Sequence, residues 1–161
     1  MTFQIEGIIP AMVTPVTVEG KTNTTALRKL TNYLIEGGVH GLFPVGSQGG
    51  FYALTFEEKK IVIEVVVEEA GGRVPVYAGT GAVTTREAVA LTQMAEAAGV
   101  AAVSVITPYF ISPSEAELCL QSPGQQEHPY RHLLQPLPGY CIGLVDSERM
   151  RQERKIKSAL I

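Results

Sequence analysis

Short apolar runs alternate with amphipathic helical patterns over residues 1–118, and this alternation limits the chain to few folds. Each run is apolar on both faces of the strand that it predicts, so other elements are expected to cover both faces. Successive runs begin about 25 to 35 residues apart, which is the spacing of strand–helix–strand units. The pattern predicts an α/β fold with a parallel sheet, either an open doubly wound sheet or an eight-stranded barrel.

The predicted strands share a short, apolar composition, and they cover residues 7–13, 41–45, 74–78 and 101–106. Glycines end the predicted helices, as is common at the residue after a helix. A capping box, in which a Thr or Ser and a Glu three residues later bond each other's backbone amides, precedes three of them. The predicted helices begin at Thr24, Thr55, Thr84 and Ser112, and the first three end at Glu36, Gly71 and Gly99.

The composition limits which classes of protein and which cellular compartments are expected. The 161 residues are 45% hydrophobic, which is typical of one globular domain, and the net charge is −3. This charge favours neither nucleic acid nor an anionic membrane as a partner. The sequence shows no leader or membrane-spanning run, and a cytoplasmic location is expected. Cys119 and Cys141 lack metal-ligand spacing, so no metal or other cofactor is expected.

The pattern changes after Leu118. Residues 119–161 have no apolar period, and prolines recur at positions 123, 129, 136 and 138. Residues 146–157 form a charged run. The expected division is therefore a structured part at 1–118 and an irregular tail at 119–161, disordered or produced by a shift of reading frame near Leu118.

The ends of the predicted strands carry a combination of motifs. These are Thr14-Pro15, Gly46-Ser-Gln-Gly49, Tyr77-Ala-Gly-Thr-Gly81 and Ile106-Thr-Pro-Tyr109. The set resembles the dihydrodipicolinate synthase / N-acetylneuraminate lyase family from about residue 7 to residue 118. This resemblance implies the first four βα units of a (β/α)8 TIM barrel, followed by the irregular tail. It also implies a class I lyase or aldolase that forms a Schiff base between a lysine and pyruvate or a related 2-oxo acid.

The resemblance assigns roles to individual residues. Ser47, Gln48 and Gly49 match the turn that holds the carboxylate of the 2-oxo acid, and Ser47 also matches a proton relay. Glycines suit this role because they let backbone amides approach an anion closely. The family's glutamate at the end of this turn is replaced by Gly50. Tyr109 and Phe110 match a tyrosine pair, and Phe110 lacks the hydroxyl that relays protons there.

Two groups on which the family's chemistry depends do not occur in this sequence. The tyrosine of a Tyr-Asn-x-Pro motif is absent, and no lysine lies in an apolar strand after residue 118. Lys155 and Lys157 lie in the charged run, whereas an imine-forming lysine needs a desolvated pocket that lowers its pKa. The chain is therefore expected to be truncated relative to its family and inactive as it stands.

Two other functions remain open from the sequence. The glycine turns could hold a small carboxylate or phosphate without covalent chemistry, or an open sheet edge could recruit another protein. The expected partner is a small-molecule 2-oxo acid, and a homo-oligomer is possible because the family forms one. Most of the residues that select one 2-oxo acid or aldehyde over another in the family match no part of residues 7–118.

Overall fold

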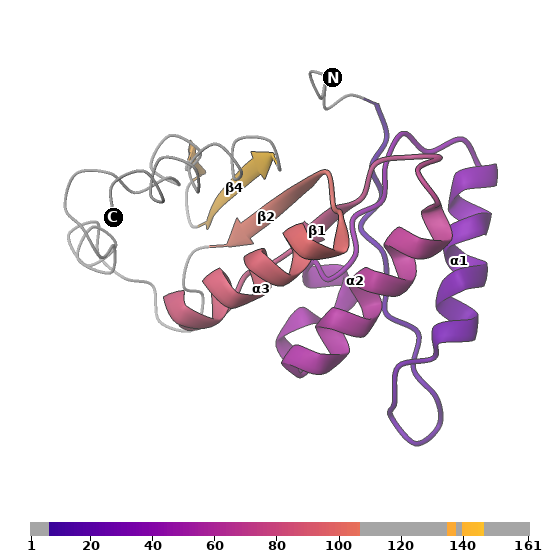
Figure 1. Ribbon diagram of the computed structural model, residues 1–161, viewed down its shortest axis with the longest axis horizontal. Coiled ribbons are helices and arrows are strands. Elements are labelled where there is room, and N and C mark those ends of the chain that lie inside the picture. Colours follow the sequence, from indigo (N-terminus) through magenta and orange to yellow (C-terminus); the bar gives the residue numbers. More distant parts are fainter. Residues whose placement is uncertain (1–6, 107–134, 138–139, 147–161) are drawn as a thin grey trace.

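The computed structural model describes residues 7–106, 135–137 and 140–146. Three helices lie side by side in chain order along one side of the strands (Figure 1). They are α1 (Thr24–Glu36), α2 (Phe56–Ala70) and α3 (Thr85–Ala98), and α2 packs between the other two. None of the helices in these ranges is long and apolar enough to cross a membrane.

The helix ends follow the capping signals in the sequence. At α1, the Asn23 side chain accepts a hydrogen bond from the amide of Ala26 at 3.0 Å. Its carboxyl end closes with Gly38 in the left-handed region at φ 82°. At α2 both halves of the predicted capping box form between Thr55 and Glu58. These bonds satisfy amides that a helix leaves unpaired in its first turn.

The capping box predicted for α3 forms only in part. The Thr84 hydroxyl accepts from the amide of Glu87 at 3.2 Å. The Glu87 carboxylate accepts instead from Nζ of Lys59 on α2, at 3.4 Å. The pairing of two helices has therefore replaced a local bond within one of them.

Four successive segments run parallel, as the sequence predicts. The amide of Met12 donates to the carbonyl of Phe43, and the amide of Tyr77 donates to the carbonyl of Leu42. Strand β1 (Tyr77–Gly79) then pairs with β2 (Ala102–Ile106) in parallel register. The first two segments form isolated bridges, Ala11 with Phe43 and Leu42 with Val76, rather than regular strands.

Prolines explain why these ladders are interrupted. Pro10, Pro44 and Pro75 each lie within or beside a predicted strand. Proline has no amide hydrogen, so it removes one bond from the ladder on which a regular strand depends. The parallel order is kept because the neighbouring residues still pair.

Two further strands lie in the region expected to be irregular. They are β3 (Gln135–Leu137) and β4 (Tyr140–Asp146), and the sheet order is β1-β2-β4-β3. Strand β4 pairs antiparallel with β2, from Ala102 opposite Asp146 to Ile106 opposite Ile142. These two segments are therefore strands, and β4 pairs along the whole length of β2, while the division of the chain near residue 118 stays a prediction. The helix predicted from Ser112, and Cys119, lie outside the described residues.

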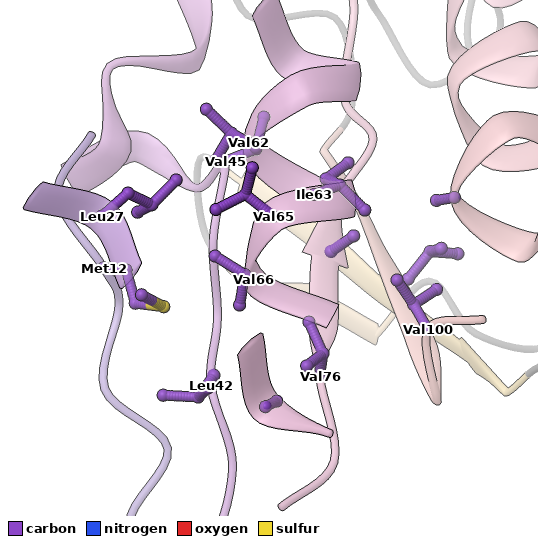
Figure 2. Packing of buried hydrophobic residues seen from close by; sticks show 14 of the residues in the cluster. Met12, Leu27, Leu42, Val45, Val62, Ile63, Val65, Val66, Val76 and Val100 are labelled. Atoms are coloured by element: carbon purple, nitrogen blue, oxygen red, sulfur yellow. The ribbon is translucent and has the colours of Figure 1, made fainter. Parts of the chain in front are cut away.

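The core lies between the helices and the parallel segments. Figure 2 shows Val62, Val65 and Val66 of α2 among side chains of the neighbouring segments, including Val45 and Val76. Leu27 of α1 and Val103 of β2 are also completely buried in this cluster. Burial of these side chains, at about 1.5 to 3 kcal/mol each, is the main favourable contribution to folding.

Candidate functional site

A small pocket of about 60 Å³ lies where the parallel segments end. Its lining residues come from three of the four segments and the loops that follow them. They are Phe43, Val45, Gly46, Ser47, Phe51, Gly79, Gly81, Ser104 and Ile106. Ligands of parallel α/β folds bind at the carboxyl ends of the strands, so this pocket is the candidate site.

The pocket borders the buried core. Ser104 and Ile106 of β2 both line it, and they share one face of the strand because successive side chains of an extended chain point to opposite faces. Val45 and Phe51 of the lining also belong to the buried cluster, and Ile106 packs against it. The pocket therefore lies where the core meets the ends of the parallel segments.

The turn at Gly46–Gly50 borders this pocket, and its first two residues line it. It contains the short 3-10 helix η1 (Ser47–Gly49), and a second one, η2 (Phe51–Ala53), follows it. The amide of Gly49 donates to the carbonyl of Gly46 at 2.9 Å, and Gly50 closes the turn at φ 66°. Within the described part of the chain, no carbonyl accepts from the amides of Ser47 and Gln48. These two amides remain available to bind an anion.

Two features hold the entrance to this turn in an unusual geometry. Val45 has φ 60°, a left-handed conformation that is strained for a β-branched residue. Gly79 lies directly against it, because a Cβ atom built at Gly79 would be 2.0 Å from the carbonyl oxygen of Val45. The amide of Gly79 also donates to the carbonyl of Pro44 at 3.0 Å. Only glycine allows β1 to approach this strained position so closely.

Two threonines named in the motifs have different positions. The Thr14 hydroxyl donates to the carbonyl of Gly49 at 2.9 Å, so Thr14 supports the turn from below. The side chain of Thr80 is completely buried. Its hydroxyl accepts from the Thr92 hydroxyl of α3 at 3.0 Å, so Thr80 joins a strand end to a helix.

The structure describes three of the five residues to which the resemblance assigns roles. Ser47 is exposed and lines the pocket. Gln48 is exposed and Gly49 is buried, and neither is part of the lining. Tyr109 and Phe110 lie outside the described residues. The assigned roles of all five remain predictions.

Sequence reasoning did not select Ser104, although its hydroxyl group lines the pocket. It pairs with Gly79 in the parallel register of β1 and β2. The alternation of residues 102, 104 and 106 could have identified it, because counting back by two from the end of a strand keeps to one face. Phe43 and Phe51 were missed for a different reason, since apolar residues carry no chemical signal of a site.

Comparisons of the sequence and of the structure with known proteins both point to one family. The model of the dihydrodipicolinate synthetase family matches residues 4–121. The 4-hydroxy-tetrahydrodipicolinate synthase of Methanopyrus kandleri is 44% identical over 119 residues, which are 73% of this chain and 40% of that protein. The enzyme of the same name from Brucella abortus is 47% identical over 71% of this chain and 39% of its own length. The chain thus spans about two fifths of the length of these relatives.

Solved structures match a similar share of this chain. A prophage protein of Escherichia coli K12, assigned to the dihydrodipicolinic acid synthase family and solved with pyruvate, has TM-score 0.68 and 39% identity over 71% of this chain and 39% of that one. Acinetobacter baumannii dihydrodipicolinate synthase, also solved with pyruvate, has TM-score 0.70 and 37% identity over 73% of this chain and 40% of that one. N-acetylneuraminate lyase of Mycoplasma synoviae has TM-score 0.68 and 37% identity over 72% of this chain and 40% of that one. Because the family match covers well over half of the sequence, the chain belongs to the dihydrodipicolinate synthetase family.

Proposed function

We propose that the pocket at the segment ends binds pyruvate or a related 2-oxo acid through its carboxylate. The observation that carries this proposal is the pair of amides at Ser47 and Gln48, which have no carbonyl partner among the described residues and belong to the pocket's glycine turn. Such amides bind anions because they donate hydrogen bonds without the steric cost of side chains. The pyruvate complexes of two structural neighbours support the same class of ligand.

The lining of the pocket favours a small ligand that binds by hydrogen bonds. None of its lining residues is charged, and Phe43, Val45, Phe51 and Ile106 make it largely apolar. A carboxylate would therefore be held by backbone amides and hydroxyl groups, with its short carbon chain against the apolar side chains. Ser47 would contribute its hydroxyl as a donor to the carboxylate and as a proton relay, and Tyr109 and Phe110 would lie at the relay position of the family.

The four parallel segments are proposed to be the first four consecutive strands of a (β/α)8 barrel. Their parallel order and the packing of helices along one side support this arrangement. The activity of the family, Schiff-base lyase or aldolase chemistry, requires an amine that condenses with the keto group. Since the sequence contains no Tyr-Asn-x-Pro motif, and the lysines after residue 118 lie in a charged run, we propose binding without turnover for this polypeptide.

Titration of the full chain with pyruvate, followed by NMR, tests the binding. Shifts confined to the amides of residues 46–51, 79–81 and 104–106 are expected, and an absence of shifts at millimolar pyruvate would contradict the proposal. Borohydride reduction in the presence of pyruvate, followed by mass spectrometry, tests the turnover. No adduct is expected, and a pyruvyl adduct on any lysine would show that the chain forms an imine after all.

A further inference from the structure

Ser104 is a buried polar residue that lines the pocket. It is only 8% exposed, and it lies in the middle of β2 on the same face as Ile106. The position opposite Ser104 in the parallel register is Gly79, which has no side chain. Nothing at the paired position of β1 therefore covers the Ser104 hydroxyl on the pocket side.

The surroundings of Ser104 leave its hydrogen-bonding capacity unused. Its carbonyl accepts from the amide of Thr80 at 2.9 Å, which fixes the backbone of β2 against the segment that follows β1. Within the described part of the chain, no group bonds to its hydroxyl. The nearby lining includes the apolar side chains of Val45 and Ile106. The Ser104 oxygen is not a fully enclosed atom without a partner, so a ligand or water in the pocket can reach it and form a hydrogen bond with it.

The two hydroxyl groups of the pocket have different positions along the segments. Ser47 belongs to the turn above the segment end, beside the free amides. Ser104 lies two residues before the end of β2, and its partner Gly79 lies against the carbonyl of Val45, just before the turn. A ligand whose carboxylate is held at the turn could therefore place its second polar group near Ser104.

We propose that Ser104 is a substrate-positioning residue whose hydroxyl donates a hydrogen bond to the keto oxygen of the bound 2-oxo acid. This inference rests on the proposed function of the same pocket. It gives the pocket a means of distinguishing a 2-oxo acid from a simple carboxylic acid. The turn then recognises the acid group, and Ser104 recognises the keto group.

Pyruvate and propionate form a matched pair of ligands for the test, because propionate keeps the carboxylate and lacks the keto oxygen. The full chain and its Ser104→Ala variant are titrated with each acid, and NMR shifts give the dissociation constants. One neutral hydrogen bond corresponds to about three- to tenfold in affinity. Ser104→Ala is expected to weaken pyruvate binding by that factor and to leave propionate binding unchanged. Ser104→Thr, which keeps the hydroxyl, is expected to restore the preference for pyruvate.

Ser47→Ala provides the contrast, since loss of a carboxylate donor is expected to weaken both acids together. An equal loss of pyruvate and propionate binding in Ser104→Ala, or no loss of either, would overturn the role of Ser104 while leaving the proposed function intact. If the unchanged chain binds neither acid, the proposed function itself fails. Alanine is smaller than serine and apolar, so the substitution is compatible with a buried strand position.

Discussion

The hydroxyl of Thr14 donates to the carbonyl oxygen of Gly49 across 35 positions of sequence, at 2.9 Å. This bond joins the end of the first parallel segment to the glycine turn that follows the second. Gly49 is buried and close-packed here, since a Cβ atom would lie 3.0 Å from the carbonyl oxygen of Met12. The turn is therefore held in place by the side chain of Thr14, which does not line the pocket.

Thr14→Val removes this bond while keeping the shape of the side chain. The buried carbonyl of Gly49 then loses its partner, and the free energy of unfolding is expected to fall by about 1 to 2 kcal/mol. Pyruvate affinity is expected to fall as well, because the turn loses its support. Urea denaturation measures the first effect. The control is Thr25→Val on an exposed position of α1, and an equal change in both variants would contradict the role of Thr14.

Gly79→Ala tests the close approach of β1 to Val45. The added Cβ meets a backbone carbonyl at 2.0 Å, which no side-chain rotation relieves. The expected loss is about 3 kcal/mol or more, observed as a lower urea midpoint or as an unfolded chain. Gly20→Ala is the control, because Gly20 also has a positive φ, of 78°, but nothing lies within 4 Å of its Cβ position. Its expected cost is about 1 kcal/mol from backbone strain alone.

Glu87→Gln tests the pairing of α2 with α3. Lys59 is only 5% exposed, and its Nζ lies 3.4 Å from the Glu87 carboxylate. Removing the carboxylate leaves a buried ammonium without its partner, so a loss of about 1 to 3 kcal/mol is expected. Glu64→Gln is the control on α2, where the partner Lys60 is half exposed and 3.8 Å away. Its effect is expected to stay below about 0.5 kcal/mol.

Lys59→Met separates the cost of burying the Lys59 ammonium from the contribution of its side-chain packing. It removes the buried ammonium and keeps a side chain of similar length, so it is expected to cost less than Glu87→Gln. Thermal melting of both variants gives the comparison. A larger loss from Lys59→Met would mean that the ion pair itself, rather than the penalty of an unpaired charge, stabilises the contact between the helices.

Tyr77 introduces a dependence of stability on alkaline pH. Burial raises the pKa of its phenol above the ordinary value of 10.0. As the pH rises, the unfolded chain therefore ionises first, and the contribution that is fully present below pH 10 is lost between pH 10 and the folded-state pKa. Urea denaturation at a series of pH values compares the wild type with Tyr77→Phe, and the difference should move in favour of Phe only above pH 10. The control is Tyr33→Phe, which removes an exposed phenol.

The sequence by itself determined the three helices and the parallel order of the four segments between residues 7 and 106. The helix over residues 24–36 has the predicted bounds, and the capping box at Thr55 and Glu58 forms as expected. These signals are local, because the period of apolar residues and the bonds at helix ends depend on neighbours within a few positions. The parallel order of the segments followed from their spacing. Gly46 and Ser47 of the glycine turn line the pocket, and the binding role of the turn stays a prediction.

The tertiary structure alone decided which groups meet. Glu87 bonds to Lys59 instead of closing its own capping box, Thr80 is buried against Thr92, and β4 pairs along β2. Each of these choices joins residues from different elements, and no local pattern specifies the neighbour across a helix interface or a sheet. Ser104 gains its importance in the same way, since a single hydroxyl in an apolar strand becomes part of a site only when Gly79 lies opposite it.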